Sequence, residues 1–170
     1  MGRCPFNPDL KSNTMDTMQI KEKNRQFTGP HKIELENWIS CAPFEKLLGI
    51  KIIKAENGKA TLTMPFLYQL AQGGGLVHGG AIVTLADTSV AMAIKSIVLN
   101  GSRFGTISLN SEFLAPVTKG ILTANANVKL LENRMIQGIS SVFNEDKKKV
   151  MTFSAMFKLA KDAKVLSGLN

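Results

Sequence analysis

The stretch that decides the fold is Gly73-Gly-Gly-Leu-Val-His-Gly-Gly-Ala-Ile-Val-Thr-Leu-Ala-Asp87, and the chain stays apolar from there to Leu99. Three glycines lead into a histidine and two more glycines, and a long apolar run follows. This pattern predicts a glycine-rich loop that opens a helix. Between Ala81 and Leu99 the only charged residues are Asp87 and Lys95. A helix that is apolar on nearly every side is buried in something larger than itself.

Asp87 is the residue of this run that needs a functional explanation, because burying an ionised carboxylate is costly unless it is paired or hydrogen-bonded. Asp87 follows His78 by nine residues. In one helix the two residues lie about half a turn out of phase and ~13 Å apart along the axis. They cannot converge on one small substrate. If both serve one site, either Asp87 comes from a second copy of the chain or the site spans two faces, and we expect a site at a subunit interface.

Composition and charge narrow the class of protein. The chain has 170 residues, of which 44% are hydrophobic, and this suits one globular domain with a sizeable core. The formal net charge is +8, and the basic residues are spread along the chain, with the densest run at Lys147–Lys149. No nucleic-acid-binding motif accompanies them, so we expect no nucleic-acid partner. A solvated basic face and the steering of a polyanionic ligand, such as a CoA ester, are the two alternatives.

Few residues are available for disulfides or metals. The two cysteines, Cys4 and Cys41, and the two histidines, His31 and His78, show neither a disulfide framework nor metal-ligand spacing. The first thirty residues lack an apolar signal core, and the long apolar run carries charges. We therefore expect a cytoplasmic protein without a membrane span.

The chain divides into three predicted parts. Residues 1–30 are polar and basic and contain prolines, which predicts a flexible N-terminal extension. Residues 31–162 are expected to form the domain, and residues 163–170 a C-terminal tail. Within the domain, residues 31–40 suit a short helix through Ile33, Trp38 and Ile39. Residues 42–48 suit a helical turn that Gly49 closes.

Alternation of apolar and polar residues predicts the strands. Asn57-Gly58 is a strong hairpin signal and joins strands over residues 50–56 and 59–65. Residues 106–113 alternate, with Ile107, Leu109 and Phe113 on one side. Short turns between successive strands indicate antiparallel pairing, and the further strands are expected at residues 121–131, 135–143 and 150–159. The sum is an α+β domain whose sheet curls round one long helix, with a second copy covering what remains.

Two stretches carry a resemblance to a known family. They resemble the hotdog-fold acyl-CoA thioesterases. The first stretch runs from Gln72 to Gly80 and is followed by Asp87, nine residues after the histidine, and the second covers residues 105–116. The most similar branch is the PaaI-like one of the 4-hydroxybenzoyl-CoA thioesterase superfamily. The resemblance covers roughly residues 44–159. It implies a curled antiparallel sheet of about six strands wrapped round one long central helix, with active sites between two chains of a dimer and dimers that often pair into tetramers.

The resemblance also implies roles for single residues. Asp87 matches the catalytic carboxylate, which acts as general base on water or as nucleophile. Its apolar neighbours are expected to raise its pKa and so strengthen it as a base. Gly79 matches the residue whose backbone N–H polarises the thioester carbonyl at the helix N-terminus, where the helix dipole favours a developing oxyanion.

Three further residues are candidates with a structural alternative each. His78 matches the loop histidine of the family, which orients the loop and touches the thioester; a purely structural, hydrogen-bonded histidine is the alternative. Gln72 stands where much of the branch has Asn and is expected to bind the attacking water or the thioester, although it is longer by one methylene. Its alternative is an exposed loop residue. Thr106 falls where relatives carry a hydroxyl that places the water, or it is an ordinary strand threonine.

The function that follows is hydrolysis of an acyl-CoA thioester to a free acid and CoA, without a metal or redox cofactor, since CoA enters as part of the substrate. Partners are then the acyl-CoA and further copies of the chain, as a homodimer or a homotetramer. A non-catalytic acyl-CoA-binding or regulatory protein is the alternative from another class. An acyl-CoA dehydratase or hydratase fits less well, because Gly73–Gly75 occupy the stretch where those relatives carry an acid and a proline. The acyl group stays open.

Overall fold

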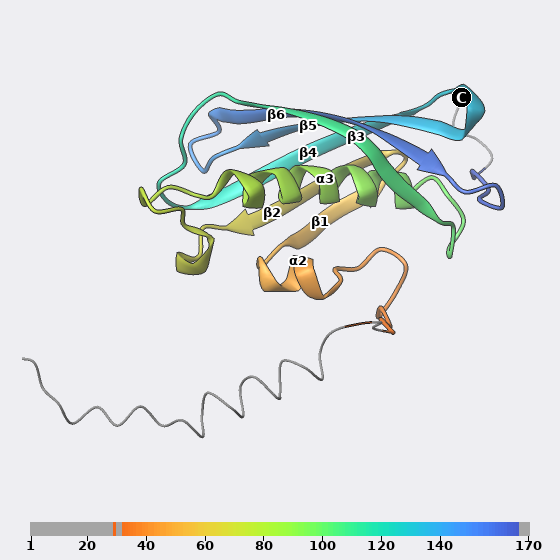
Figure 1. Ribbon diagram of the computed structural model, residues 1–170, viewed down its shortest axis with the longest axis horizontal. Helices are drawn as coiled ribbons and strands as arrows, with labels where there is room; N and C mark the ends of the chain where they lie inside the picture. Colours follow the sequence, from red (N-terminus) through yellow and green to blue (C-terminus); the bar gives the residue numbers. More distant parts are fainter. Residues whose placement is uncertain (1–28, 30–31, 167–170) are drawn as a thin grey trace, which may run out of the picture. The chain divides into compact units, whose positions relative to one another are not determined.

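The computed structural model describes Gly29 and residues 32–166 (Figure 1). The predicted extension over residues 1–30 lies outside the described residues apart from Gly29, and so do residues 167–170 of the predicted tail. The division at residues 30 and 162 therefore stays a prediction. All helices and strands named below lie in the compact unit that begins at Leu35.

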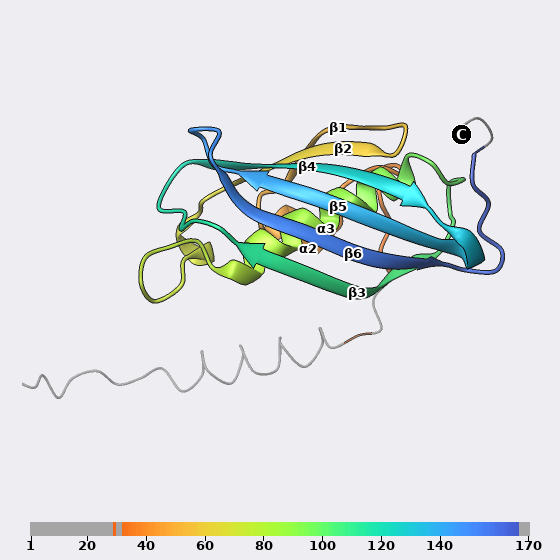
Figure 2. The ribbon, with the colours of Figure 1, turned by 90° about the horizontal axis from the view of Figure 1, so that it is seen from above.

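Six antiparallel strands form one sheet, in the order β1-β2-β4-β5-β6-β3. The long helix α3 (Gly79–Lys95) runs along one face of this sheet, and the strands curve over it (Figures 1 and 2). The predicted α+β architecture, a curled antiparallel sheet around one long helix, is confirmed. The strands are β1 (Lys51–Glu56), β2 (Lys59–Pro65), β3 (Phe104–Phe113), β4 (Ile121–Leu130), β5 (Met135–Phe143) and β6 (Lys149–Leu159).

Two of the turns form where the sequence supplies residues that tolerate a positive φ. Asn57 and Gly58 have φ of 49° and 74° and make the tight turn between β1 and β2, as the sequence predicts. The short helix α2 (Pro43–Leu47) ends before Gly49, whose φ is 69°. Single 3₁₀ turns, η1 (Tyr68–Leu70) and η2 (Glu132–Arg134), precede the glycine-rich loop and β5.

The core lies between α3 and the strands β2, β4 and β5. In β4 the predicted alternation places Leu122, Ala124 and Ala126 inside, whereas Leu130 at the strand end is 45% exposed. Val90 of α3 lies against Gly138 of β5, so closely that no larger residue than glycine fits there without a shift. Close approach of this kind explains how the sheet wraps tightly over the helix.

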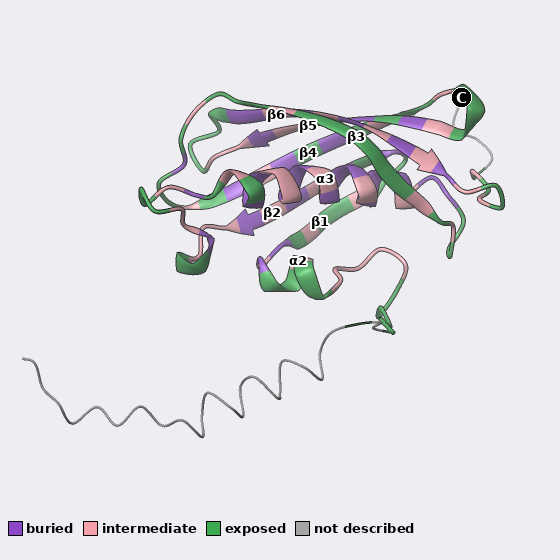
Figure 3. Cartoon of the chain, in the orientation of Figure 1, coloured by how far each residue is buried: buried purple, intermediate pink, exposed green. Residues whose placement is uncertain are grey.

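One side of α3 stays uncovered within the chain. Its residues are only half-buried, whereas the side toward the sheet is fully buried (Figure 3). The edge strand β3 beside it is exposed over most of its length (Figure 3). Burial of α3 on nearly every side, which its composition predicts, is therefore incomplete in a single chain. The half-buried residues are Val83, Thr84, Asp87, Ala91 and Lys95.

The helix predicted over residues 31–40 is wrong, since residues 36–40 form bends and residues 32–35 are irregular. The physical reason is a tertiary contact. The indole N–H of Trp38 donates to the carbonyl oxygen of Lys95 at 2.9 Å, and the Lys95 ammonium stands 5.0 Å from the centre of the Trp38 ring. These contacts hold the segment across the C-terminal end of α3. Burial also lowers the pKa of Lys95 from its ordinary value.

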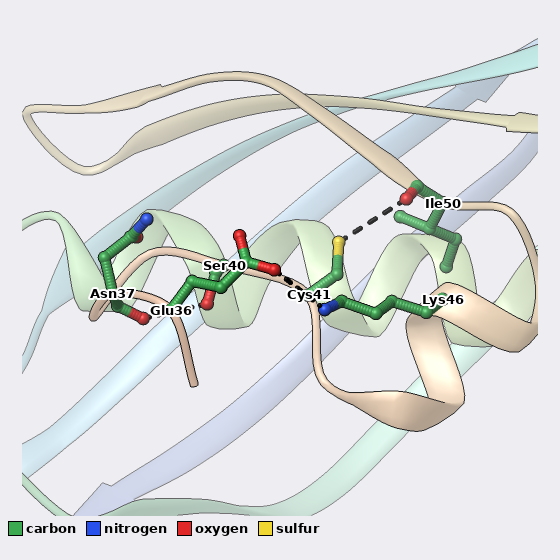
Figure 4. Close-up of polar contacts among 6 residues, drawn as sticks. All are labelled: Glu36, Asn37, Ser40, Cys41, Lys46 and Ile50. Carbon is green, nitrogen blue, oxygen red and sulfur yellow. Dashed lines mark hydrogen bonds and ion pairs between the residues drawn. The ribbon is translucent and has the colours of Figure 1, made fainter. Parts of the chain in front are cut away.

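Polar contacts join this segment and the adjacent Cys41 to α2 and to Ile50, the residue before β1 (Figure 4). The Cys41 thiol donates to the carbonyl oxygen of Ile50 at 3.4 Å, and burial raises the pKa of Cys41, so that its thiol is a structural group. Lys46 and Glu36 form an exposed ion pair at 3.2 Å. The Ser40 hydroxyl donates a local hydrogen bond to the Asn37 carbonyl oxygen at 2.8 Å. Among the described residues no helix is long and apolar enough to cross a membrane.

Candidate active site

The N-terminus of α3 is capped by His78. Its Nδ1 accepts a hydrogen bond from the backbone N–H of Gly80 at 2.9 Å, and its own backbone is extended, as at an N-cap. Because Nδ1 is an acceptor here, the proton of the neutral imidazole lies on Nε2. The structure thus gives His78 a definite structural role and leaves Nε2–H as a donor.

The backbone N–H of Gly79 has no acceptor among the described residues. The neighbouring amides are used, since Gly80 donates to the His78 ring and Ala81 to the His78 carbonyl oxygen at 3.0 Å. The free amide points from the positive end of a helix of 17 residues. A donor of this kind suits an oxygen that gains negative charge.

The glycine-rich loop brings Gln72 to the same place. The Gln72 backbone N–H donates to the Leu76 carbonyl oxygen at 2.8 Å, and Ala71 forms a bridge with Val77, so that the loop closes on itself. The Gln72 side chain folds back, and its Oε1 accepts from the Gly74 N–H at 2.7 Å. The side-chain amide nitrogen is thereby left as the donor that Gln72 offers.

A cleft of about 390 Å³ lies beside these groups. Gln72 and Gly79 form part of its wall, and the residues after β3 form another part. Among the described residues that line it, none is charged. Such apolar clefts with a few polar groups are typical binding sites for small molecules. The apolar side chains that line the cleft belong to Leu76, Val77, Ile82, Phe113, Leu114, Ala115, Pro116 and Val117.

Phe113 is a residue of this cleft that sequence reasoning missed. Its ring lies so close to Gly79 that a Cβ added there would come within 3.1 Å of the Phe113 Cζ. The sequence placed Phe113 on one side of a strand and gave it no role. Only the pairing of β3 with β6, which is not visible in the sequence, shows that this strand end reaches the start of α3.

Asp87 and Thr106 meet two turns further along α3. The Thr106 hydroxyl donates to Asp87 Oδ1 at 3.2 Å. A bulge in β3 makes this contact possible, because the pairing with β6 shifts register between Thr106 and Ser108. Thr106 before the bulge and Leu109 after it therefore lie on the same face, which strict alternation would forbid.

The environment of Asp87 makes it a stronger base. Burial raises the pKa of the Asp87 carboxyl above its ordinary value, and the hydrogen bond from Thr106 opposes this by lowering it. The balance is a raised pKa, as the apolar neighbours in the sequence predict. A carboxylate of this kind accepts a proton more readily than an exposed one.

The five candidate residues fall into two groups within one chain. Gln72, His78 and Gly79 gather at the start of α3, whereas Asp87 and Thr106 lie about 12 Å along the axis, because Asp87 follows Gly79 by eight residues in one helix. The structure does not bring the two groups together in a single copy. Among the described residues no cluster of three His, Cys, Asp or Glu side chains is placed to hold a metal ion.

Comparison with known proteins identifies a family. The profile of the thioesterase superfamily matches residues 74–151. The acyl-coenzyme A thioesterase PaaI of Escherichia coli is 37% identical over 91 residues, which are 53% of this chain and 61% of that protein. The 1,4-dihydroxy-2-naphthoyl-CoA hydrolase of Listeria monocytogenes is 34% identical over 83 residues, 48% of this chain and 67% of that protein.

Solved structures agree with this family. The E. coli PaaI protein superposes with a TM-score of 0.64 at 25% identity, covering 88% of this chain and 96% of its own. A thioesterase from Haemophilus influenzae gives the same TM-score of 0.64 at 25% identity and covers 69% of this chain and 82% of its own. The chain matches a smaller part of the curated relatives, between 59% and 67% of the length of four of them.

Proposed function

The chain belongs to the thioesterase superfamily and has its hotdog fold, and from that premise we propose that it hydrolyses an acyl-CoA thioester to the free acid and CoA. The observation that carries the proposal is the unused Gly79 N–H at the start of α3, beside an apolar cleft. Two relatives named after CoA thioester hydrolysis support the substrate class.

In the proposed reaction the thioester carbonyl lies against Gly79. The carbonyl oxygen accepts a hydrogen bond from the Gly79 N–H and gains negative charge when water attacks the carbonyl carbon. The tetrahedral intermediate then collapses, the carbon–sulfur bond breaks, and the CoA thiolate leaves and takes up a proton. The amide nitrogen of Gln72 and Nε2–H of His78 are free to donate to the substrate from the same loop.

Asp87 is the proposed general base, which removes the proton from the attacking water. In one chain Asp87 lies about 12 Å from Gly79 along the axis of α3. We therefore assign the base of each site to Asp87 of the partner subunit. The hydroxyl of Thr106 orients the carboxylate through its hydrogen bond at 3.2 Å.

The uncovered side of α3 supports a homodimer. Val83, Asp87 and Ala91 are half-buried on that side, and the adjacent face of β3 presents Leu109 at 49% and Phe113 at 52% exposure. An apolar helix face beside an unpaired sheet edge is covered well by a second copy of the same elements. Side-by-side α3 helices running in opposite directions then bring each Asp87 toward the start of the other α3.

Assembly, location, charge and partners complete this proposal. Pairs of dimers assemble into a homotetramer, and the protein acts in the cytoplasm without a metal or redox cofactor. The net charge of +8 draws the phosphates of CoA toward the protein surface. Neither nucleic acid nor a membrane is a partner.

The experiment that tests the proposal measures thiol release from acetyl-, hexanoyl-, decanoyl-, phenylacetyl- and hydroxybenzoyl-CoA. The informative variant is Gly79→Pro, which removes the N–H and adds the carbon atoms of the proline ring. Proline is well tolerated at the first helical position. His78 before it already has the extended backbone that proline requires. Gly79→Ala is the matched control, since it adds a Cβ at the same place and keeps the N–H.

We expect hydrolysis of at least one ester by the unaltered protein and a loss of about 10²-fold or more in kcat with Gly79→Pro. Gly79→Ala should lose much less. Binding of several esters without cleavage of any would contradict the proposal and favour a binding protein. Equal losses in the two variants would show that the added carbon atoms, and not the N–H, matter.

A further inference from the structure

Phe113 occupies a position that the catalytic proposal does not use. It is the last residue of β3 and pairs with Met151 of β6, which is fully buried, so its side chain lies on the face of the sheet that looks toward α3. Its ring borders Gly79 and lines the cleft of about 390 Å³. A carbonyl group bound at the Gly79 N–H would therefore lie close to this ring.

Three other apolar residues of the cleft are parts of the core. Val77, Ile82 and Val117 are at most 5% exposed, so the structure fixes the wall that they form. Phe113 and Leu114 differ, because they are 52% and 46% exposed although they line the cleft. Of these two, Phe113 supplies the side-chain atoms nearest to a Cβ added at Gly79. Its ring therefore fills space in the cleft without supporting the packing of the core, and it is the largest side chain there.

The chemistry of the lining restricts the acyl group. The cleft offers apolar side chains and the amide of Gln72, and none of its described lining residues is charged. A carboxylate or ammonium on the acyl group would lose its hydration there without gaining a partner. The cleft thus suits an uncharged acyl group.

From these observations we infer that Phe113 determines acyl-chain length, and that its ring restricts the cleft to short, uncharged acyl groups. The inference rests on the proposed function, since it concerns the acyl side of the same site. Phe113 acts on specificity and takes no part in proton transfer. Removing the ring should open the cleft to longer chains, and each additional buried methylene then improves kcat/KM about fourfold.

The test compares kcat/KM for butanoyl-, hexanoyl- and decanoyl-CoA in the unaltered protein, Phe113→Ala and Leu109→Ala. Leu109 is the matched control, because it lies on the same face of β3, is 49% exposed and does not line the cleft. We expect the decanoyl-to-butanoyl ratio of kcat/KM to rise about tenfold or more in Phe113→Ala. In Leu109→Ala the ratio should stay unchanged, whatever happens to the overall rate. Melting temperature and mass in solution are measured for all three proteins.

A ratio that does not change in folded, dimeric Phe113→Ala would overturn the inference and leave the hydrolysis intact. If the unaltered protein cleaves none of the esters, the proposed function fails instead. The length dependence is then measured by the Kd of the same uncleaved esters, for which the same change in ratio is expected. If Kd changes equally with acyl-chain length in the unaltered protein and in Phe113→Ala, the proposed role of Phe113 is contradicted.

Discussion

The Thr106 hydroxyl donates to Asp87 Oδ1 at 3.2 Å, across 19 residues of sequence. The contact joins the edge strand β3 to the one acidic residue of α3. It orients the carboxylate and favours its charged form, while burial disfavours that form. The edge strand therefore adjusts the basicity of the proposed catalytic group.

Replacing Thr106 by Val should shift the pH dependence of hydrolysis. The hydrogen bond lowers the pKa of Asp87, so its loss raises that pKa further. Because the ionised carboxylate is the active form, the acidic limb of the kcat/KM profile moves to higher pH. Thr106→Ser keeps the hydroxyl and should keep the profile. A limb that moves to lower pH, or does not move, would contradict this role.

Asp87→Asn should abolish most activity and stabilise the fold at neutral pH. We expect kcat to fall by about 10²-fold or more through loss of the general base. The raised pKa of Asp87 means that the folded chain binds the proton more tightly than the unfolded one. The stability that this proton contributes is present below the unfolded pKa of about 3.9 and is lost as the pH rises through the folded pKa.

Thermal unfolding across a range of pH checks that sign. Asp87→Asn should melt above the unaltered protein at pH values above the folded pKa of Asp87, and the difference should vanish in acid, where both side chains are neutral. A variant that melts lower at neutral pH would show that the carboxylate has a stabilising partner. Full activity of the variant would make Asp87 structural.

The assignment of each site to two chains can be tested with mixed dimers. Asp87→Asn and Gly79→Pro chains, each inactive alone, are co-produced with two different tags, and the mixed dimer is purified. One of its two sites then combines an intact Gly79 with an intact Asp87, so we expect about half of the unaltered activity.

The control dimer pairs an unaltered chain with a chain that carries both substitutions. Each of its sites lacks one group if sites are shared, and it should be inactive. If each chain holds a whole site, the outcomes are reversed: the first mixed dimer is inactive and the control keeps about half of the activity.

His78 can be separated into a capping and a catalytic role. His78→Ala removes the acceptor of the Gly80 N–H and should cost about 1 kcal/mol of stability, the usual effect of losing an N-cap. His78→Asn supplies another cap and should keep most of that stability. A large loss of kcat in His78→Asn, without loss of stability, would show that Nε2–H acts on the substrate. Retained activity would leave His78 with the cap alone.

Much of the fold could be predicted because the decisive signals are local. The turn at Asn57-Gly58, the alternation in the first half of β4 and the long helix in the apolar run each depend on neighbouring residues, and each is confirmed. The segment around Trp38 was predicted wrongly because its conformation depends on Lys95, 57 residues away. The pattern of apolar and polar residues within a short segment does not report a contact between residues so far apart in the sequence.

The sequence named candidate residues for the site, and their roles stay predictions, whereas their arrangement in space could not be predicted. The resemblance pointed to Gly79 and Asp87, and the helical spacing suggested that His78 and Asp87 do not meet in one chain. The sequence did not reveal the bulge at Ile107, which turns Thr106 toward Asp87. It also did not reveal that Phe113 lies beside Gly79. Both depend on the register of β3 against β6, which is set by packing of distant segments.

The bulge in β3 also bears on aggregation. An exposed edge strand with apolar side chains is a template on which further strands can add without end. In β3 the bulge interrupts the row of backbone donors and acceptors between Thr106 and Ser108, so an incoming strand cannot match the whole edge in one register. The bulge that brings the Thr106 hydroxyl to the proposed base thus also disfavours the addition of further strands along this edge, as in a fibril.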